Sequence, residues 1–200
     1  MNAPALPAYL QNRQSQGVAA RATTGMGGIL PPHISIAGNG FTLIDAAGNK
    51  MPLGQSMQAC VVDISDQMNK RYYENEWTQG SDEPPTCFSR NGVSPSRDSQ
   101  TPQAKFCSEC EWNKRGSDTS KLSGKPIKAC RDEKDLALLL PQFPTMLFQL
   151  TVPPGSFKNW SAFIAPFKPG GPDVSDVLVS FGFQPQANGV MTFQATAYID

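Results

Sequence analysis

Cys107-Ser108-Glu109-Cys110 is the stretch that decides how the middle of this 200-residue chain folds. Cys87 and Cys130 stand symmetrically around it, each separated from the nearer cysteine of the pair by nineteen residues. A C-x2-C pair flanked by two further cysteines supplies the four thiolates of a tetrahedral structural zinc site. The residues between Cys87 and Cys130 are rich in Ser, Pro, Gly, Lys and Asp. We therefore expect a bound Zn²⁺ to order a segment with too little apolar surface to fold alone.

Two disulfides are the alternative use of the same four cysteines. Residues 1–20 contain no apolar stretch typical of a secretory signal peptide. This favours a cytoplasmic location, where thiols stay reduced. A redox-active C-x2-C pair usually belongs to a βαβ pattern, and none surrounds Cys107 and Cys110. The expected zinc site is closed by four thiolates, so it leaves no position for a catalytic water and predicts a structural metal.

The composition predicts one β-rich domain with room for an insertion. Glycine and proline contribute 17 and 18 residues, which favours turns and short strands over long helices. Seventeen Lys and Arg oppose seventeen Asp and Glu, so the chain is not a globally basic nucleic-acid binder. No apolar run reaches the length of a transmembrane helix, and we expect no membrane association.

Alternating and apolar runs outline a series of strands around the cysteine array. We interpret residues 1–30 as a flexible arm and 31–200 as one domain, with the zinc-binding insertion at about 84–132. The leading architecture is an OB-like, five-stranded Greek-key barrel with one short helix; a β-sandwich carrying the zinc loop at one edge is the alternative. The helix is expected from Ser156, as its cap, to about Phe163. Strands are expected at 33–36, 41–45, 58–64, 70–77, 136–140, 146–152, 176–183 and 190–198.

Residues suited to catalysis are few, and we expect a binding protein rather than an enzyme. His33 is the single histidine, so a Ser/His/acid set cannot be positioned with it. Cys60 is the thiol outside the array, and it lies in an apolar strand that would bury it. No phosphate-binding glycine motif occurs. A nuclease using acids such as Asp63 and Asp66 with Mg²⁺ is a remaining alternative.

Aromatic rings beside basic side chains are the positive signal for function. Between Lys105 and Arg131 there are seven bases and three acids, an excess of four. Flat rings stack on unpaired bases while cations contact phosphates. Two other interpretations are open: the lysines neutralise the zinc thiolates, and the rings fill the protein interior. The candidate nucleic-acid contacts are Lys70, Arg71, Tyr72, Tyr73, Trp77, Lys105, Phe106, Trp112, Lys114, Arg115, Lys125 and Lys128.

Several runs together resemble a family of bacteriophage single-stranded-DNA-binding proteins. The runs are PPTCFSRNGVSPS at 84–96, FCSECEWNKRGS at 106–117, GKPIKAC at 124–130, and VLVSFGF at 177–183 after Trp160. The resemblance covers residues 33–198 and implies an OB fold with a four-cysteine zinc element. It further implies coating of replication, recombination or repair intermediates without catalysis.

The leading hypothesis is therefore sequence-tolerant binding of single-stranded DNA in the cytoplasm of a bacterial host. Expected partners are single-stranded DNA, phage or host replication proteins, and further copies of the chain along the DNA. A zinc-stabilised protein-interaction module that recruits replication proteins is the alternative function. DNA binding predicts a steep dependence of affinity on salt, because phosphate contacts release counterions.

Overall fold

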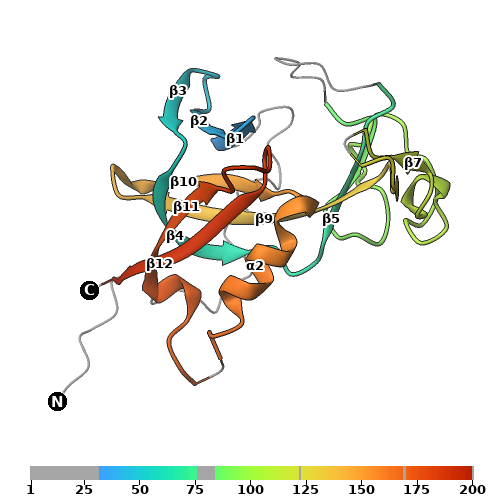
Figure 1. The fold of residues 1–200 in the computed structure, drawn as a ribbon. Coiled ribbons are helices and arrows are strands. Elements are labelled where there is room, and N and C mark those ends of the chain that lie inside the picture. The colour runs from blue at the N-terminus through green and yellow to red at the C-terminus, as the bar shows by residue number, and fades with distance from the viewer. Residues whose placement is uncertain (1–31, 76–83, 122, 169, 200) are drawn as a thin grey trace. The chain divides into compact units, whose positions relative to one another are not determined.

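The computed structural model describes residues 32–75, 84–121, 123–168 and 170–199 (Figure 1). The expected arm at 1–30 and the candidate contact Trp77 lie outside these residues. The chain divides into two compact units. We call Met1–Ile64 with Asp135–Asp200 the β unit, and Ser65–Lys134 the cysteine unit. The cysteine unit thus extends beyond the 84–132 segment expected from the cysteine array.

The described part of the β unit begins with three short strands. β1 (His33–Ala37) and β2 (Gly40–Ile44) match the strands predicted at 33–36 and 41–45, and they form a hairpin. Its turn uses Gly38 at a φ of 59°, a conformation that glycine adopts without strain. β3 (Lys50–Gly54) was not predicted, because Lys-Met-Pro-Leu-Gly is short, lacks β-branched residues and is mostly exposed.

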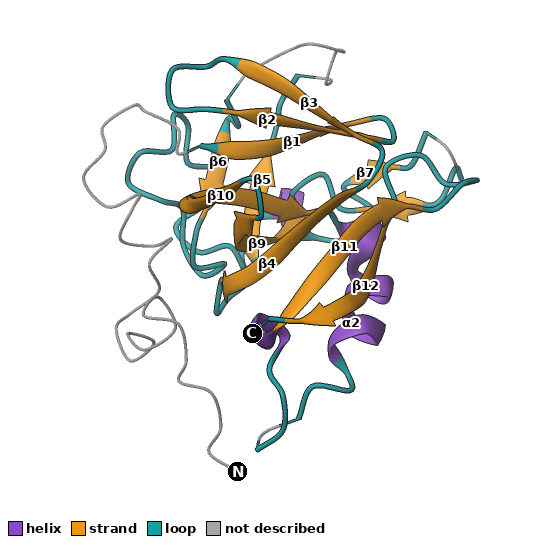
Figure 2. Ribbon diagram, turned by 90° about the vertical axis from the view of Figure 1, so that its left-hand side faces the viewer, coloured by secondary structure: helices purple, strands orange, loops and turns teal. Residues whose placement is uncertain are grey.

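A single curled sheet organises the β unit and confirms the prediction of a mainly β protein. Its remaining strands are β4 (Met57–Ile64), β9 (Arg131–Leu140), β10 (Phe143–Val152), β11 (Val177–Phe183) and β12 (Met191–Tyr198). The strand order is β12-β11-β4-β9-β10-β1-β2-β3. Neighbouring strands along this path with a described register are antiparallel, except that β1 pairs parallel to β10. The curl is visible in Figure 2, where β11 and β12 run at a steep angle to β1 and β2.

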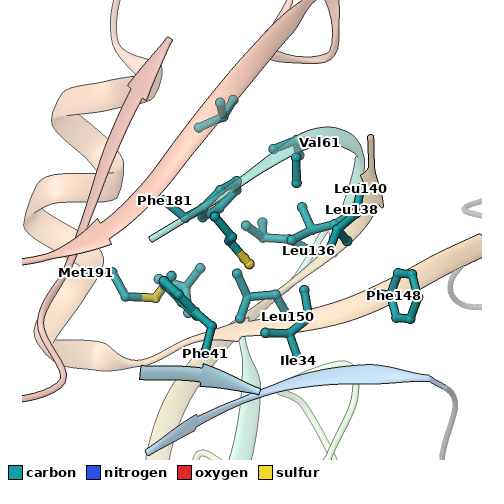
Figure 3. Close-up of a cluster of buried hydrophobic side chains, with 14 of the residues drawn as sticks. Ile34, Phe41, Val61, Leu136, Leu138, Leu140, Phe148, Leu150, Phe181 and Met191 are labelled. Atoms are coloured by element: carbon teal, nitrogen blue, oxygen red, sulfur yellow. The ribbon is translucent and has the colours of Figure 1, made fainter. Parts of the chain in front are cut away.

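The hydrophobic core belongs to the β unit, where its side chains converge from several strands (Figure 3). Alternation explains which side chains enter it: Met57, Ala59 and Val61 of β4 are buried, while the residues between them are not. The most deeply buried large side chains are Phe41, Phe148, Phe181, Leu136, Leu138, Leu140, Leu150, Met191, Val61, Val152 and Val179. Apolar burial of this kind stabilises the sheet by about 25 cal/mol per Å² removed from water.

The predicted helix is present as α2 (Phe157–Ile164), preceded by the 3-10 turn η2 (Pro154–Ser156). Trp160 is buried, and the partly buried Phe157, Phe163 and Ile164 pack against the core. The expected capping role of Ser156 is wrong: its hydroxyl makes no helix-cap bond. Instead it accepts a hydrogen bond of 2.9 Å from the backbone N–H of Met191, because that donor is buried and needs a partner.

The cysteine unit has a small sheet of its own. β5 (Asn69–Tyr72) lies between β6 (Cys87–Ser89) and the first residues of β9, antiparallel to both. β5 ends at Tyr72, so it is shorter than the strand expected over 70–77. A two-residue ladder joins β7 (Asp118–Thr119) to β8 (Pro126–Ile127), and η1 (Glu111–Asn113) follows the cysteine pair. β9 continues from this sheet into the β unit.

Candidate functional site

The four array cysteines line one cavity of about 20 Å³ in the cysteine unit. Cys87 opens β6, Cys107 and Cys110 form the turn before η1, and Cys130 directly precedes β9. Three of them are buried, Cys87 is half-buried, and all four are free thiols. Segments far apart in the sequence thus deliver four sulfur donors to one place.

Backbone hydrogen bonds fix the segments that carry these sulfurs. The N–H of Cys107 donates to Val93 O at 2.8 Å, and the N–H of Cys130 donates to Trp112 O at 2.9 Å. The side-chain amide of Asn113 donates to Cys107 O at 2.7 Å. These bonds hold the cysteine pair and Cys130 in a defined arrangement before any ion is considered.

Burial keeps the Cys107 and Cys130 thiols of the cavity protonated in the absence of an added positive charge. Burial raises the pKa of the Cys130 thiol to about 12, although Lys70 acts in the opposite direction. Burial also raises the pKa of Cys107, against a hydrogen bond from Ser89 and the charge of Lys70. Buried thiols ionise only when positive charge compensates them, and a divalent metal supplies that charge directly.

The donor chemistry and the geometry of the cavity give different answers about a metal. Four sulfur donors around one small cavity match the ligand set of a structural zinc site. Among the described residues, however, no three or more His, Cys, Asp or Glu side chains are arranged as a metal-holding group. We give more weight to the donor set, because four free thiols in one cavity have the composition that zinc requires.

A charged cluster lies beside the cavity. Lys70 Nζ lies 2.5 Å from Asp132 Oδ1, and Lys128 Nζ binds the other carboxylate oxygen. Both lysines also donate to Asn113 Oδ1 at 3.1 Å. Burial raises the pKa of Asp132, but the hydrogen bonds from Lys128 and Lys70 outweigh it and hold the pKa below its usual value. The candidate contacts Lys70 and Lys128 are therefore engaged within the protein.

Two candidate rings also pack against each other. Tyr72 and Trp112 are stacked with their centroids 5.0 Å apart and their planes 13° from parallel. Trp112 Nε1 donates to Gln103 Oε1 at 3.1 Å, and Tyr72 is only 7% exposed. One face of each ring is thus taken up by the other, as the interior-packing interpretation requires.

The other described candidates for nucleic-acid contact are either exposed to solvent or half-buried at the small sheet. Phe106 is 39% exposed, and Lys105 Nζ lies 5.4 Å from the centroid of its ring. Arg71 and Tyr73 are half-buried on the small sheet. The remaining candidates are exposed bases: Lys105, Lys114, Arg115 and Lys125.

The sequence interpretation overlooked Phe88, Arg90 and Arg131, which lie on or beside the same sheet. The Arg90 guanidinium carbon lies 4.9 Å from the centroid of the Phe88 ring. Arg131 is exposed and pairs in register with Arg71. The sequence contained one signal for these residues. Phe88 and Arg90 are two positions apart, and extended backbone places such residues on the same face.

Basic side chains are concentrated in one segment of the cysteine unit. The whole unit has twelve Lys and Arg against eleven Asp and Glu, but residues 84–134 have ten Lys and Arg against six Asp and Glu, an excess of four. The β unit has five Lys and Arg against six aspartates. Phosphate binding by this chain would therefore depend on the cysteine unit.

Comparison with protein families, with curated proteins and with solved structures gave no match to this chain. None of the helices in the described ranges has the length and apolar character needed to cross a membrane.

Proposed function

We propose that the protein binds single-stranded DNA without sequence preference, and that Zn²⁺ orders the unit responsible. The observation that carries the proposal is the excess of basic over acidic side chains at residues 84–134 of the cysteine unit, together with the exposed ring of Phe106 in the same segment. Cations there attract the phosphates, and rings offer stacking surfaces to any unpaired base. Action in a bacterial cytoplasm, together with phage or host replication proteins and further copies of the chain, belongs to the same proposal.

Zinc has a structural role in this proposal. Cys87, Cys107, Cys110 and Cys130 would hold the ion, because they are the sulfur donors that share one cavity. A closed four-thiolate site supplies folding free energy and leaves no position for substrate. The hydrophobic cluster of the described residues contains no side chain of the cysteine unit. A metal would supply the missing stabilisation.

We further propose that the β unit is an elaborated OB-like barrel. The order β4-β9-β10, followed by α2 and then β11 and β12, places a helix between the third and fourth strands, and β11 returns to pair with β4. β1 pairs with the outer side of β10 and adds a hairpin. In this interpretation the cysteine unit occupies the loop between the first two barrel strands. That loop is one of the nucleic-acid-binding loops of OB folds.

Anisotropy of a labelled oligothymidine, titrated at about 50 mM and about 200 mM salt, tests the proposed binding. We expect affinity to fall steeply with salt. Changing both Lys114 and Arg115 to alanine should weaken binding and reduce the salt slope by roughly 0.7 for each phosphate that is no longer neutralised. The matched control changes Lys158 and Lys168, two exposed lysines of the β unit, and should leave both quantities unchanged. Absent or salt-independent binding would refute the proposal.

A further inference from the structure

The register of the small sheet sorts the residues of the cysteine unit onto two faces. On β5, Lys70 pairs with Ser89 and Asp132, while Arg71 pairs with Phe88 and Arg131. Successive side chains of a strand point to opposite faces. Lys70, Tyr72 and Ser89 line the four-cysteine cavity, and Phe88 borders it as well. Arg71 and Arg131 are not part of that lining, and alternation along β5, β6 and β9 places the side chains of Arg71, Arg131 and Phe88 on the other face of the small sheet. We call this the arginine face.

Tyr73 and Glu133 join the arginine face at its β9 side. Arg71 Nη1 lies 3.0 Å from Glu133 Oε2. Tyr73 hydrogen-bonds to Arg71, and its hydroxyl also senses the charges of Glu133 and Arg131. Burial raises the pKa of Tyr73, so the phenol stays neutral at physiological pH. The Tyr73 side chain therefore lies near the guanidinium groups of both Arg71 and Arg131.

Arg90 and Phe88 extend the face on β6. The guanidinium of Arg90 lies over the Phe88 ring and is held there by Asp98, with Nη1–Oδ1 and Nη2–Oδ2 distances of 3.1 and 2.8 Å. Both members of this ion pair are more than half exposed, at 56% and 58%. A phosphate can compete for such a guanidinium, because an exposed ion pair contributes at most about 1 kcal/mol.

Arg131 is the arginine of this face that is open to an anionic partner. It is exposed, and none of the ion pairs between described residues includes it. It also pairs directly with Arg71 across the strands, and like charges in that position repel. A bound anion between the two guanidiniums would relieve the repulsion. The arginine face therefore has an electrostatic reason to bind a phosphate.

Aromatic rings on the face favour an unpaired strand over a duplex. Phe88 pairs with Arg71 across the strands, and Tyr73 directly follows β5. Both side chains are half-buried. Protein rings stack on the flat faces of unpaired bases, and the bases of a duplex are stacked on one another instead.

We propose that the arginine face, formed by Arg71, Tyr73, Phe88, Arg90 and Arg131, is a platform for single-stranded DNA, with Arg131 contacting phosphate and Phe88 stacking on a base. This inference rests on the proposed function and assigns it to one surface. The surface lies on the opposite side of the small sheet from the four cysteines. Three of its members, Phe88, Arg90 and Arg131, were absent from the contacts expected from sequence.

Arg131→Gln and Phe88→Leu test the platform, with Lys158→Gln as the matched control for loss of one exposed charge. Each purified full-length variant is titrated with labelled oligothymidine and with a duplex of equal length at several salt concentrations. Arg131→Gln should weaken oligothymidine binding and lower the salt slope by roughly 0.7. Phe88→Leu, which keeps an apolar side chain but removes the ring, should weaken binding about fivefold or more with little change in slope.

The outcomes separate this inference from the proposed function. If the wild-type protein binds no oligothymidine, both fail. If the wild-type protein binds but Arg131→Gln matches Lys158→Gln, the function stands and the platform is overturned. Equally tight binding of the duplex would also overturn the platform, because stacked bases cannot reach both rings. Thermal melts accompany each titration, and Arg131→Gln decides the question if Phe88→Leu fails to fold, since the Arg131 side chain is exposed.

Discussion

Replacing Cys107 with serine should unfold the cysteine unit while leaving the β unit folded. A serine hydroxyl is a poor zinc ligand, so the variant loses one of four donors and with it most of the metal affinity. Apparent zinc binding in small metal-stabilised domains contributes about 10–16 kcal/mol, which is as large as the whole stability of a typical domain. The cysteine unit cannot replace that contribution. Apart from the cysteines, Tyr72 is its one buried apolar side chain among the described residues.

The β unit should tolerate the same change. All eighteen buried members of the hydrophobic cluster lie in the β unit. Cys60→Ser is the matched control, because Cys60 lies in β4 of the β unit and outside the four-cysteine cavity. We expect the control to retain one zinc ion and the wild-type unfolding behaviour of the cysteine unit.

Elemental analysis combined with amide hydrogen exchange measures both effects. Wild type and Cys60→Ser should contain one zinc per chain and protect β5 and β6 from exchange. Cys107→Ser should contain none and lose that protection, while β4 and β11 stay protected. The reasoning is refuted if wild-type protein prepared without chelators carries no metal, or if Cys107→Ser keeps its β5 and β6 protection.

Packing and charge lead to three further predictions. Asp132→Asn should destabilise the cysteine unit by about 1–2 kcal/mol in urea unfolding, an amount reduced because the ion pairs are partly exposed. The folded-state pKa of Asp132 lies below its usual value of 3.8, so its carboxylate stabilises the folded protein at pH values above 3.8. This stabilisation is lost as the pH falls through the folded-state pKa, and the difference in stability between Asp132→Asn and wild type should therefore shrink in acid. Leu138→Ala should destabilise the β unit by about 2–5 kcal/mol without changing zinc content, because Leu138 is fully buried there; loss of zinc would contradict this. Cys60 should react slowly with iodoacetamide at neutral pH and keep accelerating above pH 9, since burial raises its pKa above 9.0; a rate that levels off near pH 8 would contradict it.

Most of the strands were predictable because their pattern is local. The hairpin around Gly38, the helix at 157–164 and the final pair of strands each follow from alternation or helical spacing over a few residues. β3 was missed because an exposed edge strand needs no apolar alternation, and its neighbour β2 alone positions it. The role of Ser156 was misjudged for a related reason. Its partner, the N–H of Met191, is 35 residues away.

At the candidate site, too, some features followed from local sequence and others depended on contacts between distant segments. Sequence spacing alone selected four cysteines, and the fold brings all four to one cavity. Spacing could not tell that Lys70 was engaged, because Lys70 meets Asp132 only once β5 and β9 have paired. It also could not show that Tyr72 and Trp112 stack on each other rather than standing open.

The sequence by itself determined the β-rich character and the sulfur-donor set, since both depend on residue type and short-range spacing. Only the tertiary structure decided which charges and rings face outward. Strand register places Arg71 between Phe88 and Arg131 and turns Lys70 toward the cysteines, and a shift of one residue would exchange the two faces. Register depends on pairings between segments about 15 to 60 residues apart along the chain, which no local pattern specifies.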